Sequence, residues 1–188
     1  MSSLDKTFED VIATIGNPES LNPAKSDPVL YFVYPPEQML EVKRSLPRWS
    51  SKLRDAGYQV ERISFRTLLW EIIDNSGRWE SWLEVEAEAD PEQINESIKD
   101  VVRSGNRLVN LVGDRLNAAP DDAVVLLTDT EVLHPYFRTR TIESALHDKV
   151  KIPTVIFYPG RRSGQYGLHF LDFYPVDGNY RSTLVGGD

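Results

Sequence analysis

The stretch VLYFVY at residues 29–34 decides the fold. It contains only β-branched, aromatic and leucine side chains, without the alternation of polar and apolar residues that marks a half-exposed strand. A strand that is apolar on both faces must be covered on both faces, as happens when helices pack on either side of a parallel sheet. VLYFVY therefore predicts a central parallel strand in an α/β protein.

Other apolar runs and helical stripes alternate along the rest of the chain. Further strands are expected at 58–65, 123–129, 153–159 and 168–175. Helices are expected at 4–15, 36–56, 66–75, 77–89 and 133–148, with a longer one from Pro91 to Leu116. Pro47 predicts a kink, or a break into two abutting helices, near residues 45–47. The alternation predicts an α/β fold with a mostly parallel, P-loop-like or Rossmann-like sheet of about five strands flanked by helices.

We interpret residues 1–188 as a single domain, because the chain is long enough to close one core. Residues 1–27 form a helix and a loop that could pack loosely. The segment PTVIFYPGRRSGQYGLHFLDFYP, residues 153–175, contains the last two predicted strands. The loop between them is too short for a crossover helix, so the two strands should form an antiparallel hairpin at the edge of the sheet.

Composition restricts the classes of function. Acidic residues outnumber basic ones by 29 to 21, and the net charge of −8 disfavours broad, non-specific binding to nucleic acid. From residue 131 onward basic and acidic residues are nearly balanced, so an anion would be favoured in this last third. The absence of cysteine excludes disulfides, thiolate metal sites and cysteine nucleophiles. The N-terminal residues resemble neither a signal peptide nor a membrane span, so we expect a cytoplasmic protein.

No complete catalytic, metal-binding or cofactor-binding motif is present in the sequence. Gly160, Gly164 and Gly167 lack the spacing, the following lysine and the following helix of a phosphate-binding loop. Asp129 follows a buried strand and could hold Mg²⁺, but without a phosphate loop we favour Thr128 and Asp129 as a turn and helix-cap signal. The three histidines share no metal-ligand spacing. The sequence therefore predicts a protein that is not an enzyme and has no catalytic, cofactor or metal site.

Two basic and aromatic segments are candidates for contact with a partner, because arginine and tyrosine combine planar hydrogen bonding with large contact area. The candidate residues are Tyr136, Phe137, Arg138 and Arg140 in HPYFRTRT, and Arg161, Arg162 and Tyr166 in the glycine-bearing loop. The alternative is that Phe137 is a core residue, that the arginines bond nearby carboxylates, and that the loop is only a turn. If Arg138 and the loop converge, they would form an anion-recognising corner.

The stretch from residue 80 to 100 is strongly acidic. Its charged side chains are Glu80, Glu84, Glu86, Glu88, Asp90, Glu92, Glu96, Lys99 and Asp100. Such a stretch could attract a basic partner, but it is more often the solvated face of a helix.

The C-terminal third resembles the BrxB family of bacteriophage-exclusion (BREX) defence systems. The resemblance lies in LLTDTEVLHPYFRTRTIESAL, IPTVIFYPGRRSGQYGLHFLDFY and NYRSTL, and it covers residues 123–184 well and the rest of the chain loosely. The shared features are a buried strand ending near an aspartate, the segment from Pro135 to Arg138, the strand end from Tyr158 to Gly160, the loop glycine Gly164, and Tyr180-Arg181. Arg161 and Arg162 fall where the family is expected to vary.

The resemblance implies a non-enzymatic component of a multi-protein system that methylates host DNA and blocks phage replication. The implied partner is a PglZ-like protein of alkaline-phosphatase fold, alongside a methyltransferase and a large ATPase. It adds Arg181 to the candidate interface and carries over no catalytic residue. The leading hypothesis is therefore an assembly or adaptor subunit that binds the PglZ-like protein. A nucleic-acid-binding accessory factor of the same system is the second hypothesis, and a degenerate nucleotide-binding protein is the third.

Thermal unfolding separates the third hypothesis from the other two. A ligand that binds only the folded state must raise the midpoint of unfolding. Because the phosphate-binding motif is missing, we expect no change in the midpoint when ATP or GTP is added with Mg²⁺. A rise that depends on the nucleotide would instead establish a nucleotide site.

Overall fold

The computed structural model describes residues 2–21, 27–147, 149–165, 167–178, 180 and 182–187. The strands are β1 Val29–Tyr34, β2 Gln59–Ser64, β3 Ala123–Thr128, β4 Thr154–Ser163, β5 Gly167–Phe170 and β6 Thr183–Gly186. The α-helices are α1 Ser3–Ile15, α2 Met39–Asp55, α3 Phe65–Asn75, α4 Trp79–Val85, α5 Pro91–Arg103, α6 Arg107–Ala118 and α7 Thr139–Leu146. Short 3₁₀ helices are η1 Pro36–Gln38, η2 Ser104–Asn106 and η3 Thr130–Leu133.

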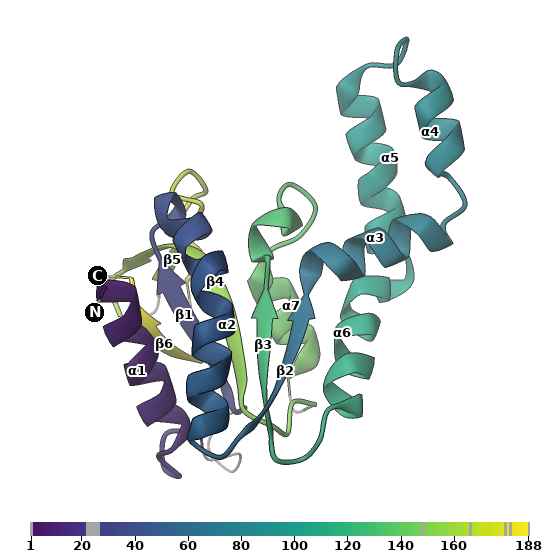
Figure 1. The fold of residues 1–188 in the computed structure, drawn as a ribbon. Helices are drawn as coiled ribbons and strands as arrows, with labels where there is room; N and C mark the ends of the chain where they lie inside the picture. The colour runs from purple at the N-terminus through teal and green to yellow at the C-terminus, as the bar shows by residue number, and fades with distance from the viewer. Residues whose placement is uncertain are drawn as a thin grey trace.

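Five of the strands form a parallel sheet in the order β2-β3-β4-β1-β6, and β5 pairs antiparallel with β4 (Figure 1). Helices cover both faces of the sheet. This confirms the predicted α/β fold with a mostly parallel sheet flanked by helices.

Strand β1 is buried along its whole length and contributes to two cores. Leu30 and Phe32 face a cluster formed with α1 and α2, whereas Tyr31 and Val33 face a cluster formed with α3, α5, α6 and α7. Strands β3 and β4 divide their side chains in the same way. This is the period of two expected for a strand between two layers, and it explains why VLYFVY lacks polar positions.

The N-terminal helix α1 packs firmly on the sheet. It begins with a capping box in which Ser2 and Asp5 exchange backbone and side-chain hydrogen bonds. Phe8 and Val11 on its inner face are completely buried. The loose packing considered for residues 1–27 is therefore not seen in this helix, and residues 22–26 of the following loop lie outside the described residues.

The helices differ from the sequence prediction at three places. Helix α2 runs as one helix through Pro47, so the prediction of two abutting helices is wrong. The long helix expected from Pro91 is interrupted because Gly105 and Asn106 adopt left-handed conformations, which separate α5 from α6. The helix expected at 133–148 is only α7, because Pro135 lacks a backbone donor and restricts the residue before it.

The C-terminal strands also differ from the prediction. The antiparallel hairpin is confirmed, but β4 is central in the sheet, and only its extension Gly160 to Ser163 pairs with β5. Strand β5 ends at Phe170 instead of continuing to residue 175, because Leu171 and Asp172 have positive φ angles. Gly160 is required for this pairing, since a Cβ there would lie 2.0 Å from the carbonyl oxygen of His169. Strand β6, which was not predicted, pairs in parallel with β1.

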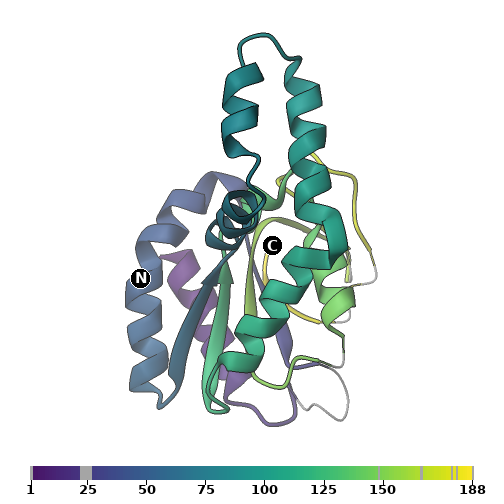
Figure 2. The same ribbon diagram turned by 90° about the vertical axis from the view of Figure 1, so that its right-hand side faces the viewer.

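Helix α4 and the outer turns of α5 extend beyond the end of the sheet (Figures 1 and 2). We call residues 79–97 the arm. Of the α4 residues only Trp82 is buried, and its Nε1 donates a hydrogen bond to Ser97 Oγ of α5 at 2.9 Å. The arm is therefore a helical hairpin joined to the body through α3 and the inner half of α5.

Candidate functional site

The carboxyl ends of the parallel strands meet at one edge of the sheet, where open α/β sheets usually bind ligands. Strand β1 leads through Pro35 directly into η1, without a glycine-rich turn. Strand β3 ends at Thr128, followed by Asp129, and β4 continues past this edge into the hairpin. This edge therefore holds both the Asp129 region and the candidate interface.

Asp129 lies at the centre of a compact group of charged and hydroxyl side chains. Its side chain is 1% exposed and lies 3.3 Å from Lys43 Nζ and 3.1 Å from Arg62 Nη2. Ser64 Oγ donates a hydrogen bond to Asp129 Oδ2 at 2.6 Å. Lys43 also contacts Glu131 Oε1 at 2.5 Å. Two cations thus face two carboxylates.

This arrangement keeps Asp129 ionised. Burial acts to raise the pKa of its carboxyl group, but the hydrogen bond from Ser64 and the charges of Lys43 and Arg62 outweigh burial and lower the pKa below its ordinary value. Within the part of the chain that the structure describes, no three acidic or histidine side chains are grouped as metal ligands. Asp129 occupies the cap position of η3, but its side chain makes no capping hydrogen bond there. The predicted turn and cap position are therefore found at Asp129, but its side chain does not cap the helix and instead ties β3 to α2 and β2.

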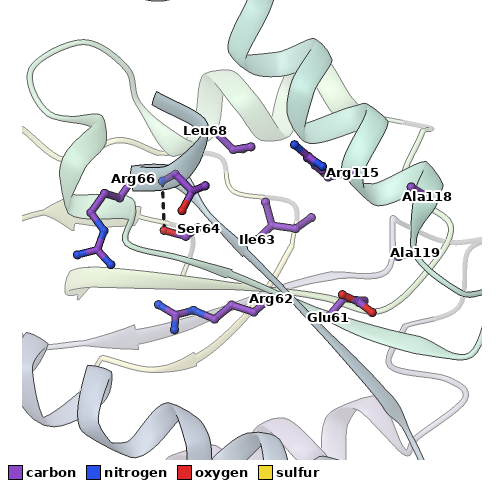
Figure 3. A pocket seen from close by; sticks show the side chains of 10 residues that line it. Glu61, Arg62, Ile63, Ser64, Arg66, Leu68, Arg115, Ala118 and Ala119 are labelled. Carbon is purple, nitrogen blue, oxygen red and sulfur yellow. Dashed lines mark hydrogen bonds between the residues drawn. The ribbon is translucent and has the colours of Figure 1, made fainter. Parts of the chain in front are cut away.

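A groove of about 630 Å³ lies beside β2, the strand at one end of the sheet order (Figure 3). Its lining comes from β2, the start of α3 and the end of α6. The guanidinium groups of Arg62 and Arg66 extend toward the same side, while Arg115 on α6 lies apart from them and pairs with Glu71 at 3.0 Å. None of the candidate interface residues that the structure describes lines this groove.

Three of the predicted interface arginines contact one short segment, residues 171–177, which follows β5. The Arg138 guanidinium lies 3.2 Å from the centre of the Tyr174 ring. Arg140 pairs with Asp177 at 2.6 Å. Arg161 donates to Asp172 at 2.7 Å and to Glu37, at the start of η1, also at 2.7 Å. The structure thus brings residues from α7 and the hairpin together around this segment.

Phe173 and Tyr174 of this segment and His134, which follows η3, form a group of aromatic side chains that we call the ledge. Phe173 stacks on Tyr174 with 4.5 Å between ring centres, and Phe173 is 62% exposed. His134 packs edge-on against both rings and hydrogen-bonds the Tyr174 hydroxyl group. Burial and the nearby charge of Arg138 lower the pKa of His134 below its ordinary value. At neutral pH the ledge is therefore an uncharged aromatic surface bordered by Arg138.

The other predicted interface residues are placed differently. Phe137 packs against the core and Arg103 lies over its ring at 5.7 Å, while Arg103 Nε donates to the Tyr136 carbonyl oxygen at 2.8 Å. The Arg162 backbone amide donates to the Gly187 carbonyl oxygen at 3.1 Å, which attaches the hairpin to the residue after β6. Tyr166 and Arg181 lie outside the described residues.

Sequence reasoning missed Phe173, an exposed residue of the ledge. Residues 168–175 read as a strand, in which Phe173 would be one of several alternating apolar positions. The available signal was Asp172, because aspartate interrupts the apolar run and tolerates a left-handed backbone better than most residues.

The open parallel sheet and its charge-paired carboxyl edge define an α/β protein in which β1 is not followed by a phosphate-binding loop. A family model described as BREX protein BrxB matches residues 61–185, which is more than half of the chain. The chain therefore belongs to the BrxB family, as the resemblance of its C-terminal third indicated, and this membership implies a role in BREX phage defence. No curated protein and no solved structure matched the chain.

A search of the described residues for a membrane-crossing segment found no helix with the necessary length and apolar character.

Proposed function

We propose that this protein is a non-enzymatic assembly or adaptor subunit of a BREX complex, and that the ledge binds a PglZ-like protein. The observation that carries the proposal is the exposed Phe173, stacked on Tyr174 and bordered by Arg138. Interfaces concentrate their binding energy in aromatic and arginine side chains that lose contact with water on association. Phe173 and Arg138 are already held by intramolecular contacts, so little conformational freedom remains to be lost on binding.

The local charges favour a protein partner over nucleic acid. Arg140 and Arg161 are paired with Asp177, Asp172 and Glu37, so their charges are largely neutralised within the molecule. A surface that binds phosphates generally needs several unpaired cations, and the overall charge of −8 adds repulsion. The anion-recognising corner considered from the sequence therefore receives little support, whereas an apolar contact surface fits the exposed rings.

The first test is co-purification of the tagged protein with the PglZ-like protein encoded beside it, followed by sizing at two salt concentrations. Phe173→Ala and Arg138→Ala are each expected to weaken this binding by about ten-fold or more, since the first removes a side chain of the ledge and the second removes the arginine that borders it. Arg54→Ala is the matched control, because Arg54 is exposed in the last turn of α2, far along that helix from the carboxyl edge.

Circular dichroism and thermal unfolding should show that all three variants fold. If Phe173→Ala and Arg138→Ala bind the PglZ-like protein as tightly as wild type does, the proposed role of the ledge is disproved. Loss of folding in Arg138→Ala would make Arg138 a structural residue, and Phe173→Ala alone would then decide. A purified wild-type protein that retains nucleic acid and ignores the PglZ-like protein would favour the nucleic-acid-binding alternative.

A further inference from the structure

The base of the arm exposes a stripe of large apolar side chains. Trp70, in the middle of α3, is 46% exposed, and Trp79 and Leu83 of α4 are 38% and 47% exposed. The rings of Trp70 and Trp79 meet edge to face with 5.3 Å between their centres. Trp79 and Leu83 are four residues apart in α4, so they lie on the same side of that helix. Val85, at the end of α4, is also 47% exposed.

The stripe is not explained by the packing of the arm itself. Helix α4 packs on α5 through Trp82, and the neighbouring side chains of Trp79 and Leu83 remain partly exposed. A tryptophan side chain can bury 150–250 Å² when it is covered, which makes two adjacent exposed tryptophans unfavourable in water. Adjacent exposed aromatic residues on a projecting hairpin are typical of a surface that a partner covers.

Carboxylates dominate the arm and indicate the charge of that partner, because residues 79–97 contain seven acidic and no basic side chains. The eight acidic residues between positions 80 and 100 are all exposed, and the single lysine among them, Lys99, is paired with Glu96. Glu80, Glu84 and Glu86 make no ion pair with any described residue. Interfaces place positive potential opposite negative potential, so the rim of the arm complements lysine and arginine.

We propose that the arm is a second docking surface, which binds a protein whose apolar pocket is flanked by lysine and arginine. The tryptophans and Leu83 fill the pocket, and the glutamates pair with the cations at its rim. Nucleic acid and anionic membranes have the same sign of charge as the arm and are repelled by it. A second copy of this chain would place two acidic rims against each other, which disfavours self-association through the arm.

The arm and the ledge are formed by different elements, and Asn95 of the arm accepts a hydrogen bond at 3.4 Å from Tyr136, two residues after His134 of the ledge. The proposal therefore goes beyond the proposed function. It makes the protein a connector with two independent contact surfaces, one bordered by arginine and one by glutamate. Variants of one surface should leave binding at the other unchanged.

The test measures binding of the purified chain to each of the other proteins encoded in its defence system, one at a time, by calorimetry at low and high salt. Trp79→Ser and Leu83→Ser remove the apolar contact, and the double change Glu80→Lys with Glu84→Lys reverses part of the rim. The matched controls are Leu40→Ser, which changes another exposed leucine, and Asp55→Lys, which reverses an exposed carboxylate at the far end of α2.

We expect at least one of these proteins to lose about ten-fold or more in affinity with each of the three arm variants. The same binding should weaken at high salt and remain unchanged with Phe173→Ala and with both controls. The proposal is overturned if no protein binds with an affinity that depends on the arm. It is also overturned if sedimentation shows that wild type self-associates and that the arm variants do not, because the occupant would then be a second copy. Loss of all binding in Phe173→Ala alone would support the ledge and reject the arm.

Discussion

Replacing Trp49 with alanine is expected to lower the free energy of unfolding by about 4 kcal/mol, the usual result of removing a large buried aromatic side chain. Trp49 is completely buried between α2 and the sheet. Its ring stacks on Phe8 of α1 with 4.7 Å between centres and lies 5.3 Å from Phe32 of β1. The substitution would thus remove contacts that hold α1, α2 and the central strand together.

Trp49 also has a polar role that a second variant can isolate. Its Nε1 donates a hydrogen bond to Asp5 Oδ1 at 2.9 Å. That hydrogen bond is the main cause that lowers the pKa of Asp5. Trp49→Phe keeps a ring in the stack but removes the donor, so it should lower the free energy of unfolding by about 1–2 kcal/mol, less than the alanine variant does.

The pH dependence of unfolding tests the polar role. A carboxyl group whose pKa is lowered on folding stabilises the protein above its ordinary pKa of 3.8, and this contribution disappears as pH falls through the folded-state pKa. The difference in stability between wild type and Trp49→Phe should therefore shrink below about pH 4. Urea unfolding of both proteins at several pH values measures this difference.

If Trp49→Ala lowers the free energy of unfolding by less than about 1 kcal/mol, the aromatic stack contributes little to stability.

The sheet could be predicted from the sequence because its strands bury both faces. β1, β3 and the first part of β4 are continuous apolar runs, which are typical of parallel strands covered by helices on both faces. Strand β6 has only the short sequence Thr-Leu-Val-Gly, with one fully buried side chain. Its pairing with β1 depends on a contact between distant parts of the chain, which local pattern does not reveal.

The candidate interface could be predicted as a set of residues but not as a surface. The sequence showed that arginines and aromatic residues recur after residue 134. It did not show that Arg138, Arg140 and Arg161 meet at residues 171–177, because this requires the two left-handed residues after β5 to turn the chain back. The arm was likewise visible as two helices and an acidic stretch but not as a surface, since the sequence does not tell which tryptophan faces α5 and which faces water.

Replacing Asp129 with asparagine is expected to lower the free energy of unfolding by about 2 kcal/mol. Removing one partner of a fully buried ion pair usually costs about 3–5 kcal/mol, but exposure of the cations to water reduces the effect. The Lys43 and Arg62 side chains are 37% and 45% exposed. Asparagine keeps the size of the side chain and tolerates the φ angle of 60° at this position, so the change removes the charge and one acceptor oxygen without altering the backbone. Asp122→Asn is the matched control, because this exposed carboxylate only accepts a hydrogen bond from Gln59.

The sign of the pH effect follows from the lowered pKa of Asp129. The stabilising contribution is complete above the ordinary pKa of 3.8 and disappears as pH falls through the lower pKa of the folded state. Wild type and Asp129→Asn should therefore differ most near neutral pH and converge in acid. Adding Mg²⁺ distinguishes this structural role from metal binding, because Lys43 and Arg62 already neutralise the carboxylate. We expect no increase in the unfolding midpoint of either protein, and an increase in wild type that Asp129→Asn abolishes would make Asp129 a metal ligand instead.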